Sequence, residues 1–328
     1  FHYYLCRQLK GGGMEIKMNI LNALQGMGPA LLDAVGQGVL WGIMVLGVYI
    51  TYKLLDIADL TVDGSFALGG CVCAMLIVNR GMDPVAALAL ATLAGMAAGF
   101  VTGILHTVFE IPSILAGILT QISLWSINLW IMGNKSNLPL LKVDSMVTQL
   151  SGATGLNQAQ SSQVIGIIAA VIVVAVLYWF FGTEIGSALR ATGNNEDMIR
   201  ALGVNTSVTK LLALMISNGL VGMSGALVCQ SQKYADIQMG TGAIVIGLAA
   251  IVIGEVIFGW FRNFACKLAA AVIGSVIYFV IRAVVLQLGL NPNYMKLLSA
   301  IIVALALCIP VAAAKWKAYR AYSEGGES

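Results

Sequence analysis

The chain has 328 residues, of which 59% are hydrophobic and only 10% are charged, and its mean hydropathy is +0.89. A soluble protein carries roughly 25% charged residues, so a chain this poor in charge cannot cover a solvated surface. The 18 basic and 15 acidic residues give a net charge of +3, which excludes a nucleic-acid binder, and no polar stretch is long enough for a soluble enzyme domain. We therefore expect an all-α, polytopic membrane protein, because the apolar runs are unbroken and do not alternate as barrel strands do.

Apolar runs of about 20 residues have the length that a membrane helix needs. In chain order, the sequence predicts nine of them, at 36–54, 64–80, 84–108, 111–132, 163–182, 208–230, 239–259, 264–287 and 295–314. Residues 18–34 are less apolar and predict a helix lying at the membrane interface, with a tenth span as the alternative. The sequence predicts three parts: an N-terminal extension over residues 1–17 without a cleavable signal peptide, one transmembrane domain over 18–314, and a cytoplasmic tail over 315–328.

The polar segment 183–207 differs from the other loops, and placing it in the cytoplasm gives a weak excess of basic residues on that side. Gly193 predicts the end of one short helix, and a second short helix with an acidic first turn is expected to follow, capped by Asn194 or Asn195 and ending at Gly203. Its apolar face consists of Met198, Ile199, Ala201 and Leu202. Such a helix could insert into a groove of another protein or lie on the membrane surface, and the residues alone leave both readings open.

Polar side chains inside the apolar runs are candidates to line a pathway. An amide in hydrocarbon needs a partner or water, so these groups either line a path or bond to neighbouring helices, and both readings remain open. The acidic mouth of the second predicted span either caps that helix or marks a chain that re-enters the membrane. Only Arg282 approaches the middle of a predicted span as a charge. The candidate lining residues are Asp59, Asp63, Ser65, Gln121, Ser123, Asn128, Ser217 and Asn218.

Small residues predict close helix packing. Gly95, Gly99 and Gly103 recur every fourth residue and therefore share one helix face. The pair Cys71 and Cys73 lies in an apolar run, where cysteine behaves as a small hydrophobe. The chain has only two histidines, so no histidine cluster can hold a metal, and no metal site is expected.

Four stretches of the sequence match, in order, segments of a known family. Residues 184–195 (EIGSALRATGNN), followed by ALGV, resemble the coupling segment of ATP-binding cassette (ABC) importer permeases. Residues 59–70, 110–120 and 242–255 resemble three further segments of the branched-chain amino acid, ribose and simple-sugar permease superfamily, whose fold is of the type II ABC importer kind. The chain is most similar to permeases paired with lipoprotein-type binding proteins for aromatic amino acids or related solutes. Its Asp63-Gly64 form of the first segment departs from the family pattern.

The resemblance implies a permease subunit of the bacterial cytoplasmic (inner) membrane without enzymatic chemistry, and the chain has no phosphate-binding G-x-x-x-x-G-K-[ST] loop. It implies a homodimeric pore in membrane lipid, a cytoplasmic ABC ATPase dimer that holds ATP and Mg, and an external substrate-binding lipoprotein. The chain itself would carry no cofactor and bind no nucleic acid. The residues implied in coupling to the ATPase are Glu184, Gly186, Arg190, Gly193, Asn194, Asn195, Glu196, Met198, Arg200, Ala201 and Gly203.

The implied substrate is a small solute, and we expect an aromatic or branched-chain amino acid, with a sugar or nucleoside as the alternative. An ion-driven secondary transporter would place an acid in the middle of a span, and none of the predicted spans has one clearly there. An intramembrane enzyme would need paired catalytic groups at matching depth, which the predicted spans do not provide.

Overall fold

The computed structural model describes residues 28–141, 143–259 and 263–287, together with 294, 297, 299–305, 308, 315 and 316. Within this part of the chain, seven helices are long and apolar enough to cross a membrane. They are the N-terminal span (Gly28–Leu54), α2 (Val62–Arg80), α3 (Pro84–Thr107), α4 (Ser113–Ile131), α6 (Gln158–Gly182), α9 (Thr206–Gln232) and α11 (Phe264–Gln287). Each coincides with a predicted span, which confirms a polytopic helical membrane protein.

Two of the nine predicted spans are not among these seven helices. The run at 239–259 forms α10 (Ala243–Phe258), an apolar helix of 16 residues that is shorter than a span. It starts late because Gly242 has a left-handed φ of 84° immediately before it. The run at 295–314 lies largely outside the described residues.

The prediction of an interface helix at 18–34 is wrong for residues 28–34. Residues 28–34 are the first turns of the N-terminal span, and 18–27 lie outside the described residues, as do 1–17 and 317–328. Asp33 is one of the polar residues that make 18–34 less apolar than the predicted spans. It borders a cavity described below, so it does not have to face lipid.

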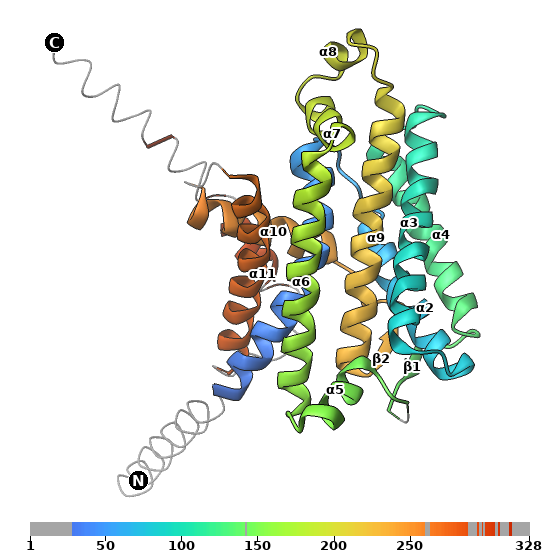
Figure 1. Ribbon diagram of the computed structural model, residues 1–328, viewed down its shortest axis with the longest axis vertical. Helices are drawn as coiled ribbons and strands as arrows, with labels where there is room; N and C mark the ends of the chain where they lie inside the picture. Colours follow the sequence, from blue (N-terminus) through green and yellow to red (C-terminus); the bar gives the residue numbers. More distant parts are fainter. Residues whose placement is uncertain are drawn as a thin grey trace, which may run out of the picture.

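The long helix α9 runs through the bundle, and its most extensive contacts are with α3 and α2 (Figure 1). The glycine repeat on α3 faces α9, in agreement with the predicted close helix packing. A Cβ on Gly95 would overlap the carbonyl oxygen of Asn218, and one on Gly99 would overlap that of Leu214. The small residues therefore let the two backbones touch. Cys71 and Cys73 are buried among apolar side chains of α2 and its neighbours, in agreement with a packing role.

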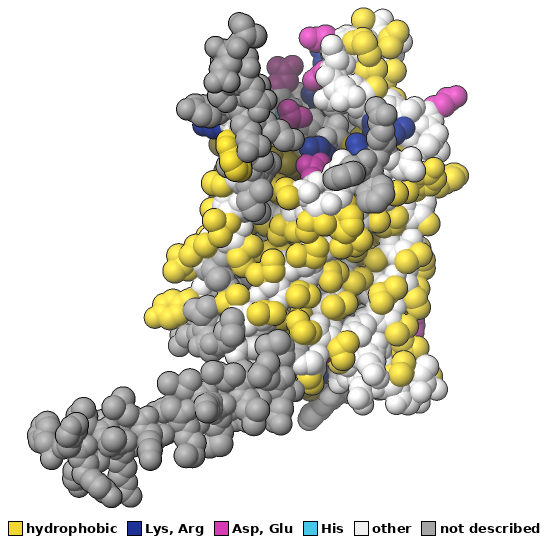
Figure 2. All heavy atoms as spheres, turned by 90° about the vertical axis from the view of Figure 1, so that its left-hand side faces the viewer, with side chains coloured by type: hydrophobic (Ala, Val, Ile, Leu, Met, Phe, Trp, Pro, Cys, Tyr) yellow, Lys and Arg dark blue, Asp and Glu magenta, His cyan; other side chains and the backbone are white. Residues whose placement is uncertain are grey.

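The surface divides into an apolar middle and more polar ends. Figure 2 shows apolar side chains across the middle of the face on view and a group of charged side chains at one end. Helices α3, α4 and α6 contribute exposed apolar residues such as Leu93, Ile122 and Val171. This distribution is that of a bundle surrounded by hydrocarbon.

The two ends of the bundle carry different elements (Figure 1). At one end lie α7 (Glu184–Asn194) and α8 (Glu196–Ala201), the α7–α8 end. At the other lie α5 (Met146–Thr154) and a two-stranded antiparallel ribbon, β1 (Asn137–Pro139) with β2 (Tyr234–Asp236), the ribbon end. The ribbon is the one exception to an all-helical chain among the described residues, and it joins two loops far apart in sequence.

Candidate functional site

A cavity of about 1010 Å³ lies between the N-terminal span, α2, α9, α10 and α11. Its lining includes Gln232, the last residue of α9, and Tyr234 of β2, so the cavity extends towards the ribbon end. Small-molecule sites in proteins usually measure roughly 300–1000 Å³, so the cavity has ample room for a solute of amino-acid size.

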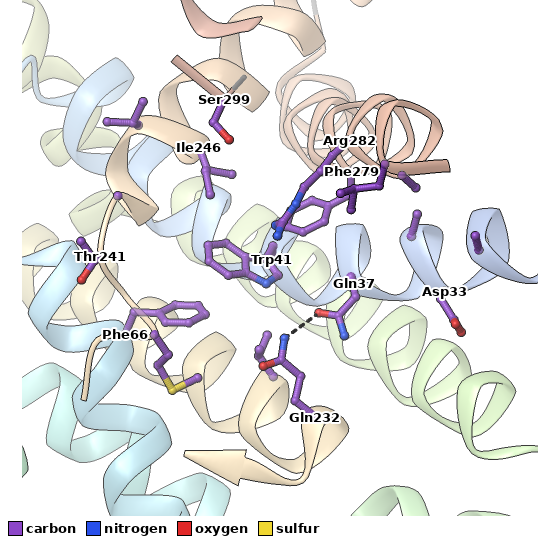
Figure 3. A pocket seen from close by; sticks show the side chains of 18 of the residues that line it. Asp33, Gln37, Trp41, Phe66, Gln232, Thr241, Ile246, Phe279, Arg282 and Ser299 are labelled. Atoms are coloured by element: carbon purple, nitrogen blue, oxygen red, sulfur yellow. Dashed lines mark hydrogen bonds between the residues drawn. The ribbon is translucent and has the colours of Figure 1, made fainter. Parts of the chain in front are cut away.

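The deep wall of the cavity is aromatic. Trp41 of the N-terminal span lies between Phe66 of α2 and Phe279 of α11, with ring centroids 4.6 and 5.5 Å from its own (Figure 3). All three rings are buried, and the indole Nε1 of Trp41 has no hydrogen-bond partner in the described part of the chain. Rings packed in this way form a surface that suits an apolar or aromatic group.

Two opposite charges border the same cavity. The guanidinium carbon Cζ of Arg282 lies 5.6 Å from the ring centroid of Phe279, a cation–π contact at the edge of the aromatic wall. Asp33 is exposed on the N-terminal span. Neither charge forms a salt bridge with another described residue. The cavity is therefore amphiphilic, with an apolar wall and a charged border.

Helical spacing brings these side chains together. Asp33, Gln37 and Trp41 recur every fourth residue on the N-terminal span and so face the same way. On α11 the lining residues follow a similar spacing, with Phe279, Arg282, Ala283 and Leu286. The sequence singles out Arg282 and Asp33 as charges in or next to apolar runs, and the four-residue repeat on the N-terminal span is the signal that could have found Gln37 and Trp41.

A second polar cluster is buried halfway along the bundle. The carboxylate of Asp59 accepts a hydrogen bond from the Asn218 amide at 2.7 Å and another from the Thr61 backbone N–H at 2.9 Å. The hydroxyl of Ser65 donates to the side-chain oxygen Oδ1 of Asn218 at 2.7 Å. The structure thus brings three of the predicted lining residues, Asp59, Ser65 and Asn218, into one network. These hydrogen bonds join groups of the chain itself, as the packing alternative describes.

The segment 55–61 between the N-terminal span and α2 is non-helical and returns into the bundle. It starts beside α7, yet Asp59 reaches Asn218, which lies near the middle of α9. Asp63, in the first turn of α2, accepts the backbone N–H groups of Gly242 and Ile244 at 2.9 and 3.0 Å. Asp63 therefore caps α10 rather than its own helix. The two helices begin beside each other inside the bundle, which favours the re-entrant reading of this acidic mouth.

None of the eight residues predicted to line a pathway borders the cavity. Ser217 donates to a backbone carbonyl of the N-terminal span, and Ser123 to a carbonyl of its own helix, as the packing alternative describes. Gln121 is half-buried on α4. Asn128 is buried on the same helix, and its amide has no hydrogen-bond partner among the described residues. A pathway role for these residues stays a prediction.

The predicted coupling residues form two short helices at the α7–α8 end. Asn195 caps α8, since its Oδ1 accepts the Met198 backbone N–H at 3.0 Å, and Gly203 ends the segment with a φ of 85°. Both features agree with the sequence prediction. Met198 and Leu202 are 52% and 71% exposed, whereas Ile199 is buried. The helix α8 therefore presents a small apolar patch outward.

The predicted role of Gly193 as a helix breaker is wrong. Gly193 lies inside α7, Asn194 is the last residue of that helix, and the φ of Gly193 is not positive. A Cβ on Gly193 would overlap the carbonyl oxygen of Leu54. The glycine is therefore required by the close approach of α7 to the end of the N-terminal span. Gly186 has a similar role, because its Cβ would overlap the backbone at the end of α6.

Charged side chains tie the α7–α8 end together. Arg190 donates to a carbonyl oxygen at the end of α6 at 2.9 Å and lies over the ring of Phe264 at 5.2 Å. Glu196 pairs with Arg200 at 3.0 Å and also with Lys210 of α9. The hydrogen bond from Lys210 outweighs the cost of partial burial and lowers the pKa of Glu196 below its ordinary value of 4.5.

The long apolar helices and a solute-sized amphiphilic cavity between them are those of a multi-pass membrane transport protein. A family model described as "Branched-chain amino acid transport system / permease component" matches residues 30–307. The chain belongs to this family, the branched-chain amino acid and ribose-type permeases of ABC importers. Its members are transport components, and ABC permeases of this kind work with an ATPase and a substrate-binding protein. In a bacterium such a multi-pass chain lies in the inner membrane.

Three relatives illustrate the range of the family. The tyrosine transport system permease protein of Clostridioides difficile is 39% identical over 273 residues, which cover 83% of this chain and 88% of that protein. An uncharacterized protein of Rickettsia prowazekii is 34% identical over 280 residues, 84% of this chain and 96% of that protein. The ribose import permease protein of Escherichia coli is 23% identical over 291 residues, 89% of this chain and 85% of that protein.

Proposed function

We propose that the chain is the membrane-spanning subunit of an importer for an aromatic or branched-chain amino acid. The observation that carries this proposal is the cavity at the ribbon end, which combines an apolar wall with two opposite charges, Arg282 and Asp33. An amino acid combines the same features, an apolar side chain and a zwitterionic head group. The similarity to a tyrosine transport permease supports the same substrate class.

The α7–α8 end faces the cytoplasm in this proposal and contacts the partner ATPase, which supplies the ATP and Mg sites. Two features support this contact. The exposed Met198 and Leu202 offer an apolar patch that a groove on a partner can cover, and the Asn195 cap holds α8 as a defined helix. The cavity then faces the external side, where a substrate-binding lipoprotein delivers the solute.

A second copy of the chain completes the pore in this proposal, as expected of a symmetric transporter. Helix α4 presents apolar side chains outward, including Ile122, Trp125 and Trp130. This face is available to lipid and to a second copy.

A sugar is the alternative substrate. The similarity to a ribose import permease favours it, and the cavity also holds polar side chains that could bond to hydroxyl groups, namely Gln37, Gln232 and Thr241. A sugar, however, would leave the charges of Arg282 and Asp33 without partners of opposite charge.

Reconstitution tests the proposal. The chain is purified with its ATPase, placed in liposomes with ATP on the ATPase side, and supplied with its binding protein and labelled L-tyrosine, L-leucine or D-ribose. We expect ATP-dependent accumulation of at least one of the amino acids and none of ribose. Accumulation of ribose alone would assign the alternative substrate, and uptake that is equal with and without ATP would contradict an ABC importer.

A further inference from the structure

We infer that the cavity at the ribbon end is a recognition site for an α-amino acid with an aromatic side chain, in which Arg282 binds the α-carboxylate and Asp33 the α-ammonium. The inference rests on the proposed function. It adds that the permease itself, and not only the external binding protein, recognises both the head group and the side chain of the substrate.

Arg282 and Asp33 lie at the same level on two packed helices. Gly38 of the N-terminal span touches Val276 of α11, and the contacts run in opposite order along the two helices, which are therefore antiparallel. Asp33 lies five residues before Gly38, and Arg282 lies six residues after Val276, so both fall at the same height towards the ribbon end. They nevertheless form no salt bridge with each other.

The guanidinium of Arg282 lies over Phe279 beside Trp41, whereas Asp33 lies two helical turns before Trp41 on the N-terminal span (Figure 3). A zwitterion that contacts both charges therefore requires the long Arg282 side chain to move from Phe279 towards Asp33. The planar guanidinium of Arg282 matches a carboxylate with two parallel N–H donors, and the carboxylate of Asp33 accepts N–H groups from an ammonium. The contact with Arg282 strengthens next to the apolar wall, because fewer water molecules screen its charge there. A neutral solute would gain neither contact.

The aromatic wall determines which side chain the site favours. The ring of Phe279 lies 5.5 Å from Trp41 and 5.6 Å from the guanidinium of Arg282, so it joins the apolar wall to the charged border. A ligand whose carboxylate lies on Arg282 extends its side chain along Trp41 and the exposed side chain of Val245. Aromatic rings gain from such a wall beyond the area that they bury.

A binding experiment with truncated ligands tests both charge assignments. The full chain is placed in lipid nanodiscs without binding protein or ATPase, and displacement of labelled L-tyrosine is measured with tyramine, which lacks the carboxylate, and with 3-(4-hydroxyphenyl)propionate, which lacks the ammonium. We expect each analogue to bind about tenfold more weakly than tyrosine, since each loses one charge-assisted contact. L-Alanine, which lacks the ring, is expected to bind more weakly still.

Two variants pair with the two analogues. Arg282→Gln is expected to lower the affinity for tyrosine and for the propionate about tenfold and to leave the affinity for tyramine unchanged. Asp33→Asn is expected to lower the affinity for tyrosine and for tyramine about tenfold and to leave the affinity for the propionate unchanged. Arg80→Gln, which removes an exposed arginine at the end of α2, is the matched control and should change none of the three affinities. The elution volume in gel filtration verifies that each variant is folded.

Four results would overturn the inference. An equal loss of tyrosine and tyramine binding in Arg282→Gln would indicate a distorted cavity rather than a lost carboxylate contact. Alanine binding as tight as tyrosine binding would remove the aromatic wall from recognition. A chain that binds no tyrosine in nanodiscs, although the complete complex imports tyrosine with ATP, would refute the cavity as a site while the proposed function stands. Import of ribose alone by the complete complex would refute both this inference and the proposed function.

Discussion

The α7–α8 end and the ribbon-end cavity are built in opposite ways. The first is one continuous stretch of sequence, residues 184–203, whose cap, acidic first turn and terminal glycine are local features. The second is assembled from five helices together with β2 and Ser299 and Ala300, and its wall joins Trp41 to Phe279, which are far apart in the chain. The exposed residues of the local element can be altered without disturbing the bundle, whereas the cavity wall is also part of the buried core. Variants at the two ends should therefore separate coupling from stability.

The largest effect is expected from Gly193→Val. Its side chain would overlap the backbone at Leu54 and push α7 away from the N-terminal span, at a cost of about 3 kcal/mol, the upper part of the range for overpacking. The melting temperature in detergent and the rate of ATP-dependent uptake should both fall. Gly182→Ala is the control, because a Cβ there meets no atom within 4 Å. An unchanged melting temperature in Gly193→Val would disprove the close contact.

Removal of the Asp63 carboxylate should have the next largest effect. Asp63→Ala leaves the N–H groups of Gly242 and Ile244 without their acceptor inside the bundle, which costs about 1–3 kcal/mol. Asp63→Asn keeps one acceptor oxygen and should lose less. The measurement is the melting temperature of each variant, and equal values for Ala and the unmodified chain would show that the cap contributes nothing.

Ala201→Asp tests the α7–α8 end without touching the core. Ala201 is exposed on α8, so the change should leave the melting temperature unaltered. An unpaired charge in the proposed ATPase contact should lower substrate-stimulated ATP hydrolysis and uptake together, by about tenfold, the effect of 1.4 kcal/mol. Binding of substrate to the external receptor should not change, and Ala201→Ser is the control. Full transport in the Asp variant would place the ATPase contact elsewhere.

The smallest effect concerns pH. The folded chain lowers the pKa of Glu196, so the stabilisation is complete above the unfolded value of 4.5 and is lost as the pH falls through the lower, folded pKa. The protection factors of the α8 amides, which correct for the pH dependence of intrinsic exchange, should therefore fall as the pH drops below 5, and more steeply than those of α9. Because the carboxylate is partly exposed, the change is modest. In Glu196→Gln this acid-induced loss of protection should disappear, and its persistence would remove Glu196 as the cause.

The sequence predicts well what depends on neighbouring residues. The seven long helices follow from local apolar runs, and α8 follows from Asn195 and Gly203, whose effects act within one turn. The family itself follows from short motifs in the right order. These properties need no knowledge of which helices touch.

The remainder depends on contacts between distant segments. Gly193 looks like a helix breaker until Leu54 is placed against it, and Asp63 looks like a cap of its own helix until α10 is placed beside it. Trp41 and Phe279 are ordinary apolar residues of two predicted spans, and only their packing makes them a wall. Spacing along one helix could have joined Asp33 to Trp41, but not either of them to α11.

The break between Leu54 and Val62 has a mechanical consequence. A continuous helix bends only by giving up several backbone hydrogen bonds, whereas this segment already lacks the regular ladder and its Ile57 N–H reaches back to Thr51. The helices α2 and α10, held to each other through Asp63, are thus joined to the N-terminal span by a segment that can change conformation without unwinding a helical turn, while Asp59 and Ser65 keep this region bonded to Asn218 of α9. One end of the break touches α7 and the other carries the start of α2, so a displacement at the α7–α8 end has only these few residues to cross before it moves a wall of the cavity.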